Sequence, residues 1–527
     1  MKKVEAKAVV TILGLGPGDP RYLTAEALRV IESAEEIWVR TARHPVMDML
    51  QNKTTVHSFD DVYERAVDLN EVYGSIAADV LQLVRDRGQV VYGVPGDPFV
   101  AEETVRRILA LAKRQKVEVK IVSGVSFLEP VFAALQLDPL ATGLQIIDAG
   151  AFLPYASYFE PSADSGASDG RPIVGPGTAA ALTWSKQPVD PTSPVLVCQL
   201  DRREVASLAK LVLLEFYPPE HEVFVVSHAG LGSREKKSKL PLFELDRQRH
   251  FDPLTVLYVP PVGAEEDQST FDGIRHVVAR LRAPGGCPWD REQTHQSLRP
   301  YLLEETHEVL EALDVRDPEK LCEELGDLLL QIVLHAQLAT ENGDFLMEDV
   351  FRGIVSKLIR RHPHVFGSHV VAGSAEVVRN WERIKQTEKG KPSSSLENIP
   401  KILPALSYAQ SLQRRVARVG FDWPEIEGVV AKVIEEMQEL KEASSAPAKA
   451  EELGDILFSL VNLARWLNVD AEDALRLANA KFKRRFQYME RLCAERGLVL
   501  KDLSLDQQEQ LWEESKEAER EMAHRSE

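Results

Sequence analysis

Residues 301–314 read YLLEETHEVLEALD and are followed by Glu324-x-x-Asp327. The same acidic pattern returns at residues 432–442, KVIEEMQELKE, followed by Glu452-x-x-Asp455. Carboxylates three and four residues apart lie on one face of a helix, where like charges repel unless a cation lies between them. Two helices that face each other with such carboxylates offer oxygen ligands to a hard divalent cation such as Mg²⁺, which also binds phosphate. The pattern therefore predicts paired helices that form a metal-dependent phosphate enzyme.

The repetition extends to a basic pair and to a Trp-Glu-x-x-Lys motif. The matching stretches are residues 357–361 with 481–485, and residues 381–385 with 512–516. All the matching motifs are separated by about 130 residues, which is the size of a domain and too long for a solenoid repeat. We therefore predict a duplicated helical unit. Each copy supplies metal ligands, basic residues for phosphate, and an aromatic side chain on which a base could stack.

Composition limits the possible classes of protein. A chain of 527 residues is too long for one core and predicts about three or four domains. The net charge of −19 argues against a nucleic acid polymer as partner, because such a partner requires a basic surface. The four cysteines form no C-x-x-C pair, so neither a disulfide framework nor a zinc site is expected. The N-terminus lacks a signal peptide's apolar core and the chain has no long apolar run, so we expect a cytoplasmic protein that does not bind a membrane.

The character of the chain changes near residue 265. Before it, short β-branched runs alternate with helical patterns, which predicts an α/β domain over residues 1–262. After it, amphipathic helices predominate, and we predict two all-α units at 271–390 and 399–527. The strands expected in the first part are Val9–Leu13, Glu36–Val39, Gln89–Val94, Val117–Val122, Leu144–Asp148, Val195–Leu200, Val223–Ser227 and Thr255–Val259.

Several motifs of the helical part together resemble the MazG family. They are the stretches GCPWDREQT at 286–294, RHPHVF at 361–366 and GFDW at 420–423, in addition to the acidic pairs. The resemblance covers about residues 271–527 and both copies. It implies an all-α nucleoside triphosphate pyrophosphohydrolase that uses Mg²⁺ to convert ribo- or deoxynucleoside triphosphates into monophosphate and pyrophosphate. Members of this size often complete their site by packing two units together, so a homodimer is expected.

The site residues of this activity are expected in both copies. Glu435 would accept the proton of the attacking water or orient it, as Glu304 would in the first copy, and Lys481 and Arg485 would hold the leaving pyrophosphate. The expected metal ligands are Glu436, Glu439, Glu452 and Asp455, and in the first copy Glu305, Glu308, Glu324 and Asp327. A di-iron site is not expected. Glu304-x-x-His307 has the required spacing, but the second copy has Gln438 at the histidine position.

The N-terminal part carries glycine-rich loops after two expected strands, Gly14–Pro20 and Pro95–Pro98. Glycines there let a ligand approach the backbone, and Pro17 and Asp19 depart from a Rossmann fingerprint. The paired Gly-Asp-Pro turns resemble the tetrapyrrole (corrin/porphyrin) methylase family over about residues 7–260. That resemblance implies binding of S-adenosylmethionine. The contacts it implies are Pro17, Pro95, Gly96, Asp97, Val100, Ser126 and Phe127.

Three departures from the methylase pattern lead us to expect weak cofactor binding. Pro95 replaces a glycine, Phe127 replaces a small residue, and the acid usually found after the second strand is replaced by Arg40, Arg43 and His44. The whole chain resembles the bacterial YabN-type fusion of a methylase-like domain with a MazG region. An alternative is an active methyltransferase whose MazG region is a regulatory nucleotide-binding or interaction module. In that case the basic residues after the second strand would favour an anionic acceptor.

Overall fold

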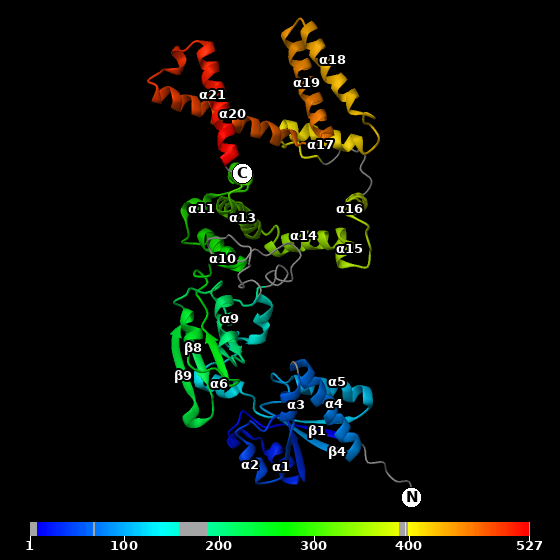
Figure 1. Cartoon of the computed structure of the whole chain (residues 1–527), viewed down its shortest axis with the longest axis vertical. Coiled ribbons are helices and arrows are strands. Elements are labelled where there is room, and N and C mark those ends of the chain that lie inside the picture. Colours follow the sequence, from blue (N-terminus) through cyan, green and yellow to red (C-terminus); the bar gives the residue numbers. More distant parts are fainter. Residues whose placement is uncertain (1–7, 67–68, 157–186, 389–395, 397–398, 526–527) are drawn as a thin grey trace. The chain divides into compact units, whose positions relative to one another are not determined.

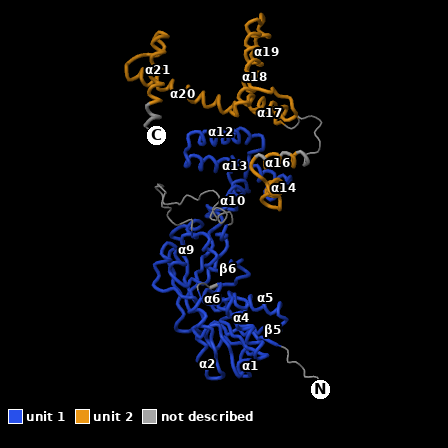
Figure 2. The backbone as a smooth tube through the Cα atoms, turned by 45° about the vertical axis from the view of Figure 1, so that its right-hand side comes forward, with its two compact units in different colours: residues 1–350 blue, residues 351–527 orange. Residues whose placement is uncertain are grey.

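The computed structural model describes residues 8–66, 69–156, 187–388, 396 and 399–525 (Figure 1). The chain divides into two compact units, residues 1–350 and residues 351–527, shown in different colours in Figure 2. Unit 1 holds both β-sheets and the first acidic helices, and unit 2 holds the second acidic helices. The boundary at residue 350 falls within the first predicted helical domain, so the predicted limits at 262, 271, 390 and 399 remain predictions.

The first sheet has five parallel strands in the order β3-β2-β4-β1-β5. Its strands are β1 (Val9–Gly14), β2 (Glu36–Val39), β3 (Thr55–Ser58), β4 (Gln89–Val94) and β5 (Glu118–Val122). The connecting helices are α1 (Ala25–Ser33), α2 (Met47–Gln51), α3 (Asp60–Arg65), α4 (Leu69–Arg87) and α5 (Glu103–Gln115), with a 3₁₀ turn η1 (Pro20–Tyr22). Buried apolar residues of the strands and of these helices form cores on the sheet. Because the strands are parallel, the loops after β1, β2, β4 and β5 meet at one edge of this sheet.

The second sheet is mixed, with the order β6-β7-β10-β8-β9 and only β6 and β7 parallel. Its strands are β6 (Gln145–Asp148), β7 (Val195–Cys198), β8 (Glu222–Ser227), β9 (Lys236–Pro241) and β10 (Thr255–Val259). The associated helical segments are α6 (Leu128–Leu135), α9 (Arg203–Leu213), η2 (Ala149–Tyr155), η3 (Gly232–Arg234) and η4 (Leu242–Arg247). All eight predicted strands are confirmed within a residue or two at their ends, whereas β3 and β9 were not predicted.

The helical region begins at α10, and the predicted order of an α/β part followed by an all-helical part is confirmed. Its helices in unit 1 are α10 (Phe271–Arg282), α11 (Pro288–Glu292), α12 (Arg299–Val315) and α13 (Pro318–Asn342), and α14 (Met347–Arg361) begins there. Val278 of α10 packs with Val333 and Leu334 of α13 in a small core. No helix in the described part of the chain is long and apolar enough to cross a membrane.

Unit 2 contains a pair of acidic helices and a second pair beside it. Its elements are α15 (Pro363–Phe366), α16 (Ser374–Glu388), α17 (Ala405–Ala417), α18 (Ile426–Glu442), α19 (Ala446–Trp466), α20 (Ala471–Glu495), η5 (Leu500–Asp502) and α21 (Leu505–Arg525). Helices α18 and α19 pack along their length, as α12 and α13 do in unit 1. Helices α20 and α21 share a core that includes Met489, Leu492 and Leu511. The two acidic helix pairs are therefore built alike, as the sequence repeat predicts.

Candidate active site and cofactor loops

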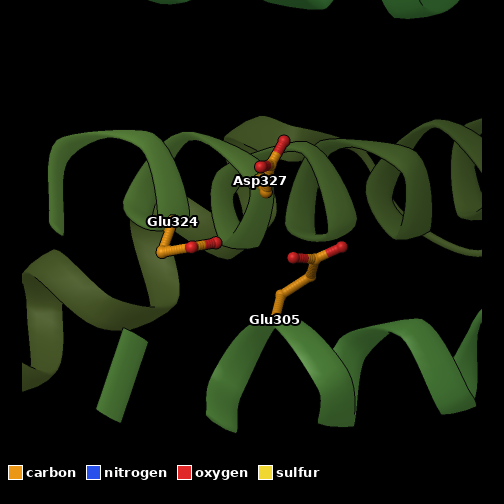
Figure 3. Close-up of side chains that lie close together, drawn as sticks. All are labelled: Glu305, Glu324 and Asp327. Atoms are coloured by element: carbon orange, nitrogen blue, oxygen red, sulfur yellow. The ribbon is translucent and has the colours of Figure 1, made fainter. Parts of the chain in front are cut away.

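The first acidic cluster lies between α12 and α13 (Figure 3). One carboxylate oxygen from each of Glu305, Glu324 and Asp327 lies within 4.8 Å of the others. A tight turn brings the helices together, since Arg316 adopts the left-handed conformation and the Asp317 carboxylate accepts hydrogen bonds from the first backbone N–H groups of α13. Glu324 is buried, which is unusual for a carboxylate unless a positively charged group lies near it. The predicted ligands of the first copy thus come together, except that Glu308 stands beside this group of three.

The carboxylates of the first cluster disfavour each other's charged form. Loss of hydration raises the pKa of Glu305, and the charges of Asp327 and Glu308 raise it further. The pKa of Glu324 is also raised, by loss of hydration and by Glu308, although Lys320 opposes this effect. A divalent cation would reverse these shifts, because it stabilises the ionised form of each ligand.

The second acidic cluster lies between α18 and α19. Glu436, Glu452 and Asp455 again present oxygens within 4.8 Å of one another. The Ser445 hydroxyl caps α19 by accepting a hydrogen bond from the Ala448 N–H. The pKa of Glu439 is raised by loss of hydration and by its neighbours Glu436 and Glu452, so it stands close to this cluster as Glu308 does in the first copy.

A lysine already compensates the charge of the second cluster. The Lys432 ammonium lies 2.7 Å from the Glu436 carboxylate and 3.0 Å from that of Glu435. These two carboxylates raise the pKa of Lys432. Lys432 is not among the site residues predicted from the sequence. Its position one helical turn before Glu435 and Glu436 was the signal that could have identified it.

A cavity of about 670 Å³ opens beside the second cluster. Glu436, Asp455 and Lys432 line it together with the apolar side chains Phe421, Trp423, Phe458 and Val416. Asn462 and Gln413 add amide groups to the wall. A cavity with aromatic walls and a few polar groups has the size and chemistry of a small-ligand site. Residues 420–423 carry part of the family resemblance in the sequence, but this pocket was not predicted from them.

The loop that carries Phe421 and Trp423 is held against α19 through Asp422. The Arg465 guanidinium donates two hydrogen bonds to the Asp422 carboxylate, at 2.9 and 2.5 Å, and the Trp466 indole N–H donates a third at 3.3 Å. This pairing lowers the pKa of Asp422. The bidentate geometry fixes the orientation of the loop as well as its position. The aromatic wall of the cavity is therefore anchored rather than free to move.

The basic residues predicted to bind pyrophosphate lie on α20. Lys481 is exposed, and Arg485 pairs at 2.7 Å with Glu519 of α21 while its guanidinium lies over the Trp512 ring. The corresponding tryptophan of the first copy, Trp381, lies under the Arg361 guanidinium in the same way. The contacts described for Arg485 are thus with α21, and its role toward pyrophosphate remains a prediction.

The loops predicted to bind the methyl donor meet at the carboxyl edge of the first sheet. Gly16 and Gly96 exchange two backbone hydrogen bonds, which join the loop after β1 to the loop after β4. The Asp97 carboxylate accepts hydrogen bonds from the Phe99 and Gly124 N–H groups, which ties in the loop after β5. A Cβ added at Gly96 would touch the backbone of Ser126 and Phe127, which shows how closely the loops approach. The structure therefore brings the loops after β1, β4 and β5 together at this edge of the sheet.

Two of the predicted cofactor residues have other contacts. The Ser126 hydroxyl donates to Glu129 and accepts from the Leu128 N–H at the start of α6. The Phe127 ring packs against an apolar cluster that includes Val131 and Leu196. Pro17 is buried, and Pro95 and Val100 are partly buried in the same loops. The predicted residues are neighbours in space, and their contact with a cofactor remains a prediction.

Sequence comparison supports both halves of this description. The profile of the MazG nucleotide pyrophosphohydrolase domain matches residues 293–366 and 425–489, which contain both acidic helix pairs. The profile of the tetrapyrrole (corrin/porphyrin) methylases matches residues 9–246, which contain the cofactor loops. The chain thus combines a tetrapyrrole methylase-like domain with a MazG-type nucleoside triphosphate pyrophosphohydrolase domain in two segments.

A relative with the same organisation is the uncharacterized protein YabN of Bacillus subtilis (strain 168). It is 41% identical over 521 residues, which cover 97% of this chain and 99% of YabN. The chain therefore belongs to the YabN family.

Two further relatives match about half of the chain. The nucleoside triphosphate pyrophosphohydrolase/pyrophosphatase MazG of Thermotoga maritima is 49% identical and covers 47% of this chain and 95% of its own length. The nucleoside triphosphate pyrophosphohydrolase of Escherichia coli K12 is 47% identical and covers 47% of this chain and 97% of its own length. Among solved structures, uroporphyrin-III-C-methyltransferase from Thermus thermophilus matches 48% of this chain and 91% of its own, at 19% identity. The TM-score of this match is 0.33.

Proposed function

We propose that the helical region hydrolyses nucleoside triphosphates to monophosphate and pyrophosphate with Mg²⁺, and that the second copy is the catalytic one. The observation that carries this proposal is the juxtaposition of the Glu436–Asp455 cluster with the aromatic cavity. Acidic side chains hold a divalent cation, and the cation binds the phosphates of the substrate. A nucleobase binds between apolar walls that carry a few hydrogen-bonding groups. The names of the Thermotoga maritima and Escherichia coli relatives support the same reaction.

Each residue of the second copy has a role in this proposal. Glu436, Glu439, Glu452 and Asp455 would hold Mg²⁺, which supplies charge stabilisation to the phosphoryl oxygens when bound. Glu435 would accept the proton of the attacking water, or orient that water, once Lys432 turns from it toward the incoming phosphates. Lys481 and Arg485 would hold the leaving pyrophosphate. Phe421 and Trp423 would stack on the base.

The test of this proposal is an assay of pyrophosphate release across ribo- and deoxynucleoside triphosphates, with and without Mg²⁺. We expect monophosphate and pyrophosphate in equal amounts, and no product when Mg²⁺ is removed. Chromatography that shows bound but intact nucleotide would contradict the hydrolase. It would support the alternative, in which the MazG region is a regulatory or interaction module of an active methyltransferase.

We also propose that the protein is a homodimer built through the acidic helix pair of unit 2. Apolar residues spaced as one helical stripe are exposed on each of its two helices. They are Val430, Ile434 and Met437 on α18, and Leu453, Leu457 and Leu460 on α19, each more than two-fifths exposed. Exposed apolar surface on this scale marks an interface. Light scattering across a dilution series should give twice the chain mass of 58.9 kDa, and a monomer at all concentrations would contradict the dimer.

For the methylase-like domain we propose weak binding of S-adenosylmethionine. The close approach of the loops around Gly96 supports binding of the cofactor. Pro95 and Phe127, which replace smaller residues of the family pattern, support a low affinity. Calorimetric titration with S-adenosylmethionine and S-adenosylhomocysteine tests it. A dissociation constant near micromolar, or about −8 kcal/mol, would contradict weak binding. Gain of binding in the Phe127→Ser variant would identify the loop as the cause.

A further inference from the structure

The cavity beside the second acidic cluster is lined by a glutamine whose side-chain amide has only one hydrogen bond. Gln413 of α17 is 5% exposed and is one of the lining residues. Its Nε2–H donates a hydrogen bond of 2.8 Å to the backbone carbonyl of Phe458 in α19. Its Oε1 is buried and has no hydrogen-bond partner among the described residues. Because buried polar atoms are almost always paired, this oxygen is an acceptor that a ligand of the cavity could satisfy.

A second buried glutamine of α17 has no such free atom. Gln410 donates through Nε2 to the Val469 carbonyl at 2.7 Å and accepts at Oε1 from the Ala471 N–H at 3.1 Å. Both ends of its amide therefore hold α17 against the start of α20. Gln410 is not one of the residues that line the cavity. The unpaired oxygen thus belongs to the glutamine that borders the cavity.

An asparagine of the same cavity presents a donor. The Asn462 Oδ1 accepts hydrogen bonds from the Arg465 Nε–H at 3.0 Å and from its Nη2–H at 2.7 Å. Arginine carries only donors, so the amide atom of Asn462 that contacts it must be the oxygen. The amide N–H groups of Asn462 are therefore available as donors to a ligand.

Neither amide can rotate by half a turn without losing its present hydrogen bonds. Rotation of the Gln413 amide would place its oxygen against the Phe458 carbonyl oxygen. Rotation of the Asn462 amide would place its N–H groups against the Arg465 guanidinium. Each rotation would replace attraction by repulsion in a partly buried site. The cavity therefore offers one fixed acceptor and one fixed donor.

The order of these groups along α19 gives the cavity a direction. Asp455 of the acidic cluster comes first, then Phe458, to which Gln413 is bonded, and then Asn462. At 1.5 Å per residue, Phe458 lies about 5 Å and Asn462 about 10 Å along the helix axis from Asp455. The loop with the aromatic residues is anchored still further along, at Arg465. A nucleotide with its phosphates at the acidic cluster therefore meets the acceptor of Gln413 before the donor of Asn462.

Nucleobases differ in the order of the same groups. Outward from the sugar, guanine, uracil and thymine present a ring N–H and then a carbonyl oxygen. Adenine and cytosine present a ring nitrogen lone pair and then an amino group. Only the first kind of base gives Gln413 Oε1 a donor and gives the Asn462 N–H groups an acceptor.

We propose that the cavity of the second copy selects nucleotides whose base carries a ring N–H beside a carbonyl oxygen, which are those of guanine, uracil and thymine. The base N–H donates to Gln413 Oε1, and an Asn462 N–H donates to the base carbonyl. Adenine or cytosine would set acceptor against acceptor and donor against donor, which should weaken binding at least about tenfold. This inference rests on the proposed function, because it places the phosphates at the acidic cluster.

The test measures the binding of α,β-methylene triphosphate analogues, in which the bond that the hydrolase would break cannot be hydrolysed. Calorimetric titration of the full chain in Mg²⁺ gives a dissociation constant for the guanosine, uridine, adenosine and cytidine analogues. We expect the first two to bind at least about tenfold more tightly than the last two. Equal affinities or the opposite order would overturn the selectivity, and no binding of any analogue would overturn the site.

Two substitutions test the named residues. Asn462→Asp keeps an oxygen for Arg465 but replaces the donor by an acceptor, and Gln413→Met removes the acceptor. Each should reduce the ratio of guanosine to adenosine affinity about fivefold or more, the equivalent of one hydrogen bond. The matched control is Gln410→Met, which should lower the Tm but leave the ratio unchanged. An unchanged ratio in either test variant that retains its fold would overturn the role of that residue, and either variant decides the proposal if the other does not fold.

Failure of this inference is distinct from failure of the proposed hydrolase. Equal pyrophosphate release from guanosine and adenosine triphosphates, together with equal analogue affinities, would retain the hydrolase and overturn the selectivity. Selective binding of the analogues without pyrophosphate release from any triphosphate would retain the base site and overturn the hydrolase.

Discussion

The two copies of the acidic helix pair share their carboxylates but differ in the cation that accompanies them. In the first copy, Tyr301 occupies the position of Lys432, and the nearby Lys320 pairs with Glu311 at 3.1 Å. In the second copy, Lys432 bridges Glu435 and Glu436 and lines the aromatic cavity. The comparison teaches that both copies bring together three carboxylates that could hold a metal ion. The lysine and the cavity of the second copy are the features on which its proposed nucleotide site rests.

The largest effect expected from this comparison concerns activity. Glu439→Gln with Asp455→Asn should reduce pyrophosphate release on the order of a hundredfold or more, because a bound metal contributes several kcal/mol of charge stabilisation. The matched pair in the first copy, Glu308→Gln with Asp327→Asn, should leave most of the activity. Steady-state assays with excess Mg²⁺ measure both. If the double variant of the first copy is the one that loses activity, the first copy is the catalytic one.

A smaller effect is expected at the cavity wall. Trp423→Leu removes a ring from the surface on which the base would stack, and should raise KM about two- to tenfold with little change in kcat. Trp289 stands at the corresponding motif of the first copy and is also about half exposed. Trp289→Leu is therefore the control and should leave KM unchanged. Equal effects of the two substitutions would show that the cavity of the second copy is not the base site.

The cation difference should be measurable in the unliganded protein. Lys432→Tyr, which gives the second copy the residue of the first, should lower the Tm of unit 2 by at most about 3 °C. The effect is small because Lys432 is about two-fifths exposed and solvent screens its charge. Added Mg²⁺ should abolish the difference, since the metal replaces the ammonium. A Tm loss that persists at saturating Mg²⁺ would mean that Lys432 acts through packing instead.

The smallest effect expected is a pH dependence in the first copy. The pKa of Glu305 is raised above its usual value of 4.5, so the folded state binds protons more readily than the unfolded state between 4.5 and the raised value. Without metal, stability should therefore rise as the pH falls toward 4.5, and Mg²⁺ affinity should fall over the same range. Thermal unfolding of the wild type and of Glu305→Gln measures the difference. If stability depends on pH in the same way in both proteins, the neighbouring carboxylates do not raise the pKa of Glu305.

Much of the fold was predictable because the central strands are buried on both faces. Runs such as Val195–Cys198 are apolar throughout and gave a clear signal. The two strands that were missed, β3 and β9, each lie at one edge of their sheet. β9 reads Lys-Lys-Ser-Lys-Leu-Pro and is mostly exposed, as is usual for an edge that must not pair with another chain. Such a strand has no apolar pattern for sequence reasoning to detect.

The candidate site was predictable to a similar degree. Repeated carboxylates at helical spacing identified both clusters, because their chemistry depends on local sequence. The cavity was not predictable, since its wall joins Phe421 from a loop to Phe458 from α19. The same limit applies to Arg40, whose partner Glu102 is distant in sequence. Contacts between helices, strands and loops that are distant in sequence depend on how these elements pack, and no short sequence motif predicts that packing.

The contact between the end of β1 and the loop after β5 has a genetic consequence. At Gly14, the last residue of β1, a Cβ would lie 2.5 Å from the Gly124 backbone nitrogen, so the two segments meet main chain to main chain. Any side chain at either position must push the two strands apart. Most damaging core substitutions can be rescued by trimming the opposing side chain, but here neither partner has one. Replacement of Gly14 or Gly124 should therefore yield no suppressors at the other position, and revertants should restore glycine itself.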